Sequence, residues 1–169
     1  MASRSYPAWK KVMKWLREAD QVETLAINGD SFVFEEIPEN FRAFMDENAK
    51  DSKWVIHDVE GERKKHIIDV VESWFYETDG LSLCAFRPHH YFIGRKGSDS
   101  LIVQLCFECG LVRTKGAIER SGFIDRENKG EEIASLFGIG VDVSPMGYRK
   151  IHFPPPEQKP KQSWPIGGT

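Results

Sequence analysis

The segment from Leu81 to Lys115 constrains the fold most, because short β-prone runs alternate in it with turn-forming residues. The runs are 81–87, 91–95, 101–107 and 111–115, and they are separated by Pro88, by Lys96-Gly97-Ser98-Asp99 and by Glu108-Cys109-Gly110. Short connections join antiparallel strands, whereas a parallel pair needs a crossover of about a dozen residues or more. The sequence therefore predicts three or four antiparallel strands in meander order, and 118–124 predicts one more.

Three helices are predicted ahead of this meander. The first begins at Ser5 and Pro7, ends near Asp20 and carries an apolar stripe at helical spacing, formed by Trp9, Val12, Met13 and Leu16. Pro38 opens a second, short helix, with Phe41, Phe44 and Met45 on its apolar side. The clearest helical pattern follows Gly61, and its apolar positions are Ile67, Val70, Val71, Trp74 and Phe75. We expect this third helix to be a main core element and to end before Thr78-Asp79-Gly80.

Asn28-Gly29 predicts a β-hairpin between 22–27 and 30–35, because both central residues of a type I′ turn need positive φ. The register of a two-residue loop would place four apolar side chains on one buried face, namely Leu25, Ile27, Phe32 and Phe34. The alternation from Lys53 to Val59 predicts a further strand.

The end of the chain predicts one more helix, a strand and a tail. Asn128 followed three residues later by Glu131 resembles a capping box, and Gly138 is a glycine stop after the apolar positions of that helix. A strand is expected around Val141 and Val143. The final sixteen residues hold five of the nine prolines, which cannot supply ladder amides. We therefore expect a single domain over 1–153 and a proline-rich, disordered tail over 154–169, in which Trp164 is a candidate anchor for a partner's groove.

Together these elements predict an α+β fold, in which an antiparallel sheet built from a hairpin and a meander packs against three or four helices. A chain of 169 residues is long enough to bury a full core without staples. Its formal net charge is -3, with both signs interspersed along the chain. Nucleic acid and anionic membranes are bound through a basic surplus or patch, so we expect neither as a partner.

The chain starts with charged residues that no apolar run follows, so no signal peptide is predicted. Its longest apolar stretches are a few residues long, whereas a transmembrane helix needs about 18 or more. The odd cysteine count of three argues against a secreted disulfide framework. We therefore expect a cytoplasmic protein.

The motif Cys106-Phe107-Glu108-Cys109-Gly110 is the local pattern with a chemical interpretation. A strand follows it, whereas a thioredoxin-like site would place the first cysteine at the start of a helix. A hairpin turn with the pattern C-x-x-C-G is the shape of a zinc knuckle, and a structural zinc ion needs four ligands. The metal-ligand candidates are Cys84, His89, His90, Cys106 and Cys109.

Other interpretations of the same residues stay open. The alternation of the run 101–107 places Leu101, Val103, Leu105 and Phe107 on one face and Ile102, Gln104, Cys106 and Glu108 on the other. Cys106 is then a small apolar packing residue, as most free cysteines are. A redox or reactive thiol, including a thiolate–imidazolium pair with a histidine of the segment Arg87-Pro88-His89-His90, is the third interpretation. In the plain structural alternative this segment only shapes a tight connection between strands.

The order of these motifs resembles a group of small uncharacterised bacterial proteins. The resemblance spans roughly Ile67 to Phe137, under half of the chain, and rests on Phe86-x-Pro88-x-His90 followed by a strand with Cys106-Phe107-x-Cys109. Members of that group often carry a cysteine directly before the first phenylalanine, where this chain has Ala85, with Cys84 one position earlier. The resemblance implies a bacterial origin and an α+β fold.

Two functional hypotheses follow. The first is a non-enzymatic protein-interaction domain, such as an immunity or inhibitor protein of a bacterial system, which covers a basic partner with an acidic surface and exposed aromatic residues. The second is a small zinc-binding or thiol-dependent protein centred on the C-x-x-C-G turn. No catalytic residues or cofactor site are assigned, and a protein is the expected partner.

Overall fold

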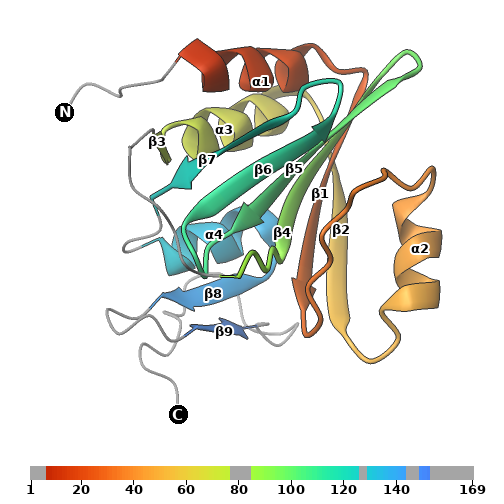
Figure 1. Ribbon diagram of the computed structural model, residues 1–169, viewed down its shortest axis with the longest axis vertical. Helices are drawn as coiled ribbons and strands as arrows, with labels where there is room; N and C mark the ends of the chain where they lie inside the picture. Colours follow the sequence, from red (N-terminus) through yellow and green to blue (C-terminus); the bar gives the residue numbers. More distant parts are fainter. Residues whose placement is uncertain (1–6, 77–84, 126–128, 144–148, 153–169) are drawn as a thin grey trace.

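The computed structural model describes residues 7–76, 85–125, 129–143 and 149–152 (Figure 1). The predicted Ser5 and Asn128 caps, residues 81–84 of the first predicted strand and the tail over 154–169 lie outside these ranges. The described part of the chain contains four helices and a seven-stranded antiparallel sheet, so the predicted α+β class is confirmed.

The strand order in this sheet is β2-β1-β4-β5-β6-β7-β3. The strands are β1 (Gln21–Asn28), β2 (Lys53–Val59), β3 (Phe75–Tyr76), β4 (His90–Lys96), β5 (Asp99–Cys106), β6 (Leu111–Gly116) and β7 (Arg120–Ile124). The predicted meander is confirmed as β4 to β7, with each strand paired to the next in sequence. The first predicted strand, over 81–87, is wrong in its described part, because residues 85–87 form no strand. A separate pair joins β8 (Gly140–Val143) to β9 (Arg149–His152), where a strand at 141–143 was expected.

Three helices cover one face of the sheet, and one helix covers the other (Figure 1). The first face packs against α1 (Pro7–Glu18), α3 (Gly61–Glu72) and α4 (Gly130–Phe137), and the second against α2 (Phe41–Asn48). The predicted stripe of α1 is buried, and so is the predicted face formed by Leu101, Val103 and Leu105 of β5 with the following Phe107. Each apolar side chain buried in this way contributes about 1.5–3 kcal/mol.

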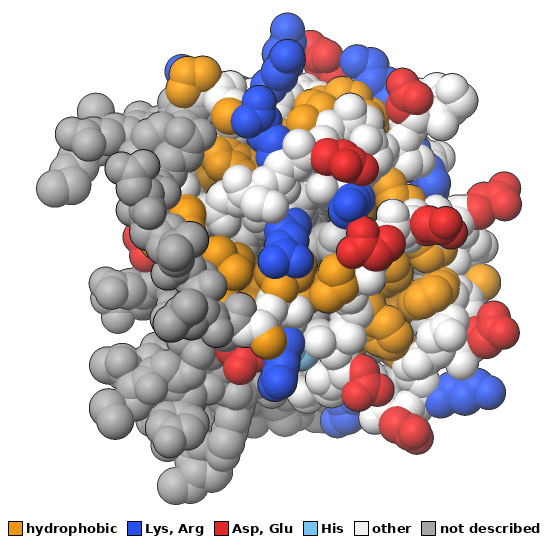
Figure 2. Space-filling model, in the orientation of Figure 1, with side chains coloured by type: hydrophobic (Ala, Val, Ile, Leu, Met, Phe, Trp, Pro, Cys, Tyr) orange, Lys and Arg blue, Asp and Glu red, His pale blue; other side chains and the backbone are white. Residues whose placement is uncertain are grey.

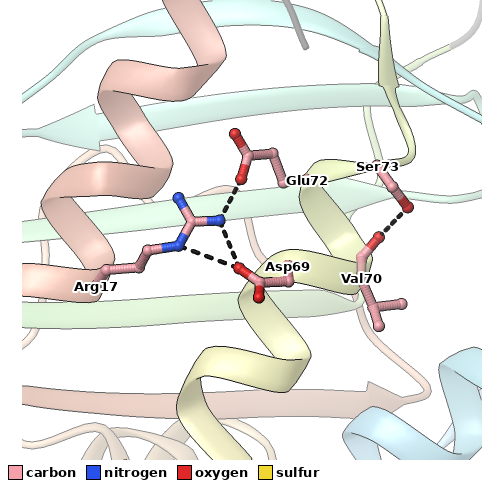
Figure 3. A network of polar contacts seen from close by, with 5 residues as sticks. All are labelled: Arg17, Asp69, Val70, Glu72 and Ser73. Carbon is pink, nitrogen blue, oxygen red and sulfur yellow. Dashed lines mark hydrogen bonds and ion pairs between the residues drawn. The ribbon is translucent and has the colours of Figure 1, made fainter. Parts of the chain in front are cut away.

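Two glycines of the sheet allow α1 to approach closely. A Cβ atom at Gly122 would lie 2.5 Å from the Trp9 ring, and one at Gly94 would lie 2.8 Å from the Trp15 ring. An arginine also ties α1 to α3 (Figure 3): the Arg17 guanidinium donates hydrogen bonds to Asp69 Oδ1 at 2.7 and 3.2 Å and to the Glu72 carboxylate. The helical layer is therefore fixed by close backbone approach and by an ion-pair network.

The predicted hairpin between 22–27 and 30–35 is wrong. Strand β1 pairs with β2 and β4, and residues 30–40 form no strand. Gly29 does adopt positive φ, at 130°, but the chain then leaves the plane of the sheet and crosses its second face. The predicted grouping of side chains survives, because Leu25, Ile27 and Phe34 are buried in one cluster against which Phe32 packs.

Helix boundaries differ from the predicted ones where capping decides them. Helix α2 begins after Asn40, whose side-chain oxygen accepts a hydrogen bond from the Ala43 amide at 3.0 Å, and not at Pro38. Helix α3 ends at Glu72, so Trp74 lies beyond it and Phe75 belongs to β3. Helix α4 begins after Lys129, which forms no side-chain cap hydrogen bond, and not after the predicted cap Asn128. Its predicted glycine stop is confirmed, since Gly138 is left-handed with φ 85°.

Candidate functional site

Residues 29–40, named here the strap, cross the second face of the sheet and are held there by side chains that rise from the strands. The Phe34 amide donates a 2.7 Å hydrogen bond to Gln104 Oε1, and Gln104 Nε2 donates back to the Phe34 carbonyl at 3.0 Å. The Tyr91 hydroxyl lies 2.6 Å from the Phe32 carbonyl oxygen and accepts the Phe32 amide at 3.2 Å. Side chains thus replace the backbone ladder that a hairpin would have provided.

The end of the strap is fixed by an arginine. Arg95 Nη2 donates hydrogen bonds to the Pro38 and Glu39 carbonyl oxygens at 2.7 and 2.8 Å. Lys115 on β6 forms a 3.1 Å ion pair with Glu35. Burial raises the pKa of the Tyr91 hydroxyl, which therefore stays neutral and able to donate. The strap is consequently anchored at three strands, β4, β5 and β6.

An aromatic cluster fills the space between the strap and α2. The Phe34 ring packs edge to face against its neighbours, with centroid distances of 5.1 Å to Phe41, 5.4 Å to Phe44 and 5.4 Å to Tyr91. Phe32 lies 5.8 Å from Phe44, and both are only partly buried. Val33, between the two strap phenylalanines, is 41% exposed. This part of the surface therefore exposes apolar groups.

Carboxylates surround these apolar groups. Residues 29–51 carry two basic side chains and seven acidic ones, a net charge of −5, against −3 for the whole chain. All seven acids are exposed, namely Asp30, Glu35, Glu36, Glu39, Asp46, Glu47 and Asp51. Figure 2 shows acidic side chains around hydrophobic ones on the side where α2 lies. We call the strap and α2 together the acidic face.

His90, one of the predicted metal-ligand candidates, lies on the opposite face of the sheet. Its ring packs edge to face against Phe107 and Phe137, and its Nε2 atom lies 2.7 Å from the Ile139 carbonyl oxygen. Burial lowers the pKa of His90 to about 3, so the ring is neutral and Nε2 carries the hydrogen that the carbonyl accepts. This histidine links β4 to the end of α4.

Cys106 lies on the strap side of the sheet. His90 is paired with Leu105, and successive residues of a strand point to opposite faces, so His90 and Cys106 are separated by the sheet. The backbone amides of Arg87 and Cys109 each lie 3.4 Å from the Cys106 sulfur and donate to it. Burial nevertheless raises the pKa of the Cys106 thiol.

Cys109 and Gly110 complete the turn. Gly110 has φ 69°, and its amide donates a 2.8 Å hydrogen bond to the Cys106 carbonyl, which closes the turn as the C-x-x-C-G pattern predicts. Cys109 is disulfide-bonded, its sulfur lies 3.0 Å from the Ala85 carbonyl oxygen, and Cys106 is a free thiol. Cys84 lies outside the described residues. A sulfur held in a disulfide is not available as a thiolate ligand.

His89 is half-buried beside the strap, with Nε2 3.2 Å from the Gly29 carbonyl oxygen. Burial is the main cause that lowers its pKa. Within the residues that the structure describes, no three His, Cys, Asp or Glu side chains are placed so that they could hold a metal ion. The described members of the predicted ligand set are thus His89 and the Cys106–Gly110 turn on one side of the sheet and His90 on the other.

The acidic face was not predicted as a unit. The sequence shows an excess of acidic residues over 29–51, and it shows Gln104 within an apolar run. Neither feature predicts that residues 29–40 cross the face of the sheet. That arrangement depends on contacts between residues about 70 positions apart.

No protein family model, curated protein or solved structure matches the chain. Among the helices of the described ranges, none combines the length and apolar character needed to cross a bilayer.

Proposed function

We propose that this chain is a protein-interaction domain that acts by binding a basic partner protein, in the manner of an immunity or inhibitor protein of a bacterial system. The observation that carries the proposal is the acidic face: a net charge of −5 over residues 29–51, arranged around the exposed Val33 and the partly buried Phe32 and Phe44. Apolar groups at the centre and charges around them are the usual composition of a protein interface. Charge complementarity accelerates the encounter with a basic partner.

The test uses charge reversal on the acidic face. The chain, bearing an affinity tag, is purified from its native host, and a stoichiometric basic partner is expected to co-purify at low salt. Asp46→Lys combined with Glu47→Lys, both exposed on α2, is expected to abolish this complex. The matched control is Lys10→Glu combined with Lys11→Glu on α1, which lies on the other side of the sheet and should leave the complex intact. Equal loss in both double variants would contradict the proposal.

A second outcome would also overturn it. If the purified chain turns over a small substrate, and a Cys106 or His89 variant loses that turnover, then the protein acts as an enzyme. An adjacent toxin-like reading frame in the source genome would favour the immunity class over other inhibitors.

The zinc-binding or thiol-dependent function is the second candidate, and the two backbone amides on the Cys106 sulfur favour it. Such N–H···S bonds stabilise a thiolate, as a zinc knuckle requires. Reduction of the disulfide at Cys109 would have to come first. Elemental analysis of reduced protein tests this candidate: less than about a tenth of an equivalent of zinc, with unchanged melting in chelator, would rule out a structural metal, because structural zinc contributes folding energy.

A further inference from the structure

The central part of the strap has the alternation of a β-strand, although it belongs to no sheet. The Phe32 and Phe34 rings lie on one side, stacked with their centroids 6.1 Å apart, and Val33 between them is exposed. In an extended segment the peptide groups of successive residues also point in opposite directions. Between Phe32 and Phe34 the strap therefore has two edges, and the chain bends at Glu35.

One edge is occupied and the other is free. The peptide N–H and C=O groups of Phe32 and Phe34 are bonded to the Tyr91 hydroxyl and the Gln104 amide. The peptide groups of Val33 and Glu35 have no hydrogen-bond partner in the described part of the chain. These groups are the ones that an added strand would use.

We propose that the free edge of the strap accepts an extended, basic segment of the partner protein as an added β-strand. Main-chain hydrogen bonds to Val33, and to Glu35 where the strap bends, would supply register and affinity, as in other cases of strand addition. Lysine or arginine side chains of the segment would face the exposed carboxylates of the strap, among them Asp30 and Glu36. This inference rests on the proposed function and adds the binding mode.

Charge decides between the two kinds of occupant for this edge. A second copy of the chain would bring an identical acidic face, so two straps paired side by side would place like charges opposite each other, which is destabilising. A basic segment meets the same surface with opposite charges. Val33 offers it an apolar contact between the carboxylates.

The experiment measures backbone amide exchange by NMR with and without a peptide of alternating lysine and valine residues. In the free protein, the Phe32 and Phe34 amides should exchange slowly and the Val33 and Glu35 amides rapidly. Saturating peptide at low salt should protect Val33 and Glu35 by about tenfold or more, because each amide gains a main-chain hydrogen bond. A second copy as the occupant would instead appear as a concentration-dependent dimer with these amides protected before peptide is added, and would overturn the proposal.

A pair of substitutions at one position isolates the backbone contribution. Val33→Pro removes a single N–H that has no partner in the described chain, and proline favours extended geometry in the residue before it. It should weaken peptide binding by about tenfold, whereas Val33→Thr, which keeps the N–H and the side-chain shape, should bind as the wild type does. Unchanged melting of the proline variant shows that the strap is still attached.

The outcomes separate this inference from the proposed function. If Asp46→Lys with Glu47→Lys abolishes the native complex while the Val33 and Glu35 amides stay unprotected by the peptide, strand addition is wrong and the acidic face remains an interface. If the charge variants leave the native complex unchanged, the proposed function fails first. A peptide that does not bind at low salt, or that binds Val33→Pro as tightly as Val33→Thr, overturns the strand addition.

Discussion

Thr24 and Thr114 are both buried threonines in the sheet, but their hydroxyl groups differ in one respect. Thr24 Oγ1 has no hydrogen-bond partner in the described residues. Thr114 Oγ1 donates to the Ile118 carbonyl oxygen at 2.6 Å and accepts the Arg120 amide at 2.8 Å. A buried hydroxyl without a partner is destabilising because it loses its hydrogen bonds to water. In a partnered hydroxyl, hydrogen bonds within the protein offset that loss.

We therefore predict opposite effects for the same substitution at these two sites. Thr24→Val should raise the free energy of unfolding by about 1 kcal/mol, because it replaces an unpartnered hydroxyl with a methyl group of similar size. Thr114→Val should lower it by about 1–3 kcal/mol, since it leaves the Arg120 amide and the Ile118 carbonyl without their partner. Urea denaturation of both variants checks the pair, and a loss of stability in Thr24→Val would contradict the assignment.

His90 makes stability depend on pH in a defined direction. Its ordinary pKa is 6.5 and burial lowers it to about 3 in the folded chain. Below pH 6.5 the unfolded chain binds a proton that the folded chain does not, so stability is full above pH 6.5 and falls towards pH 3. The slope approaches about 1.4 kcal/mol per pH unit. Burial lowers the pKa of His57 and of His89 as well, so both act in the same direction.

Denaturation across this pH range in wild type and His90→Gln checks that prediction. Glutamine can still donate to the Ile139 carbonyl but does not titrate, so the variant should show a shallower decline on acidification. An identical decline in the two proteins would assign the pH dependence to other groups.

At the scale of elements, α1 packs closely against Gly94 and Gly122 of the sheet. Any other residue at either position would force side chains of α1 to shift. Gly122→Ala should lower the free energy of unfolding by about 1–3 kcal/mol, because the new methyl group would lie 2.5 Å from an atom of the buried Trp9 ring. Ser121→Ala on the same strand is the control, since Ser121 is exposed. Thermal melting of the two variants gives the comparison, and equal melting temperatures would mean that α1 has room to shift.

The attachment of the strap to the sheet depends on the side-chain amide of Gln104. Gln104→Leu would leave the buried Phe34 peptide group without either of its partners. We predict a loss of about 1–3 kcal/mol in unfolding free energy, together with rapid exchange of the Phe34 amide. Stability close to that of the wild type would show that aromatic packing alone holds the strap.

At the scale of the whole molecule, the negative charge is concentrated in one part of the chain. Residues 29–51 carry −5, so the rest of the chain carries +2. Across the sheet from the acidic face, α1 has four basic residues and one acidic residue, α3 has three of each, and α4 has two acidic residues. The low net charge of the whole chain therefore conceals a local concentration of acidic side chains around the exposed Val33.

The cysteines give a prediction for the intact chain. With three cysteines, an intrachain disulfide at Cys109 leaves Cys106 as the free thiol. A thiol reagent should find no reactive thiol in the native protein, because Cys106 is buried, one thiol after unfolding, and three after unfolding with reductant. Three thiols without reductant would show that the chain is reduced as purified, which is the state expected for the cytoplasmic location predicted from sequence.

The sequence alone determined the elements whose signals are local. The α1 stripe, strand β2, the β4–β7 meander and the Gly138 stop follow from side-chain period, turn residues and conformational preference within a few neighbours. The faces of β5 also follow, because the pleat alternates regardless of what covers it. Even the grouping of Leu25 and Ile27 with the two strap phenylalanines was readable, since apolar side chains on one side of a turn must be buried together.

Only the tertiary structure decided what the strap does and where the candidate ligands lie. Asn28-Gly29 permits a hairpin, but β1 has ladder partners in β2 and β4, and the side chains of Tyr91, Gln104 and Arg95 replace that ladder for the strap. Neighbours in sequence such as His89 and His90 point to different faces of the molecule. These outcomes depend on pairings across tens of residues, whose energies no local pattern contains.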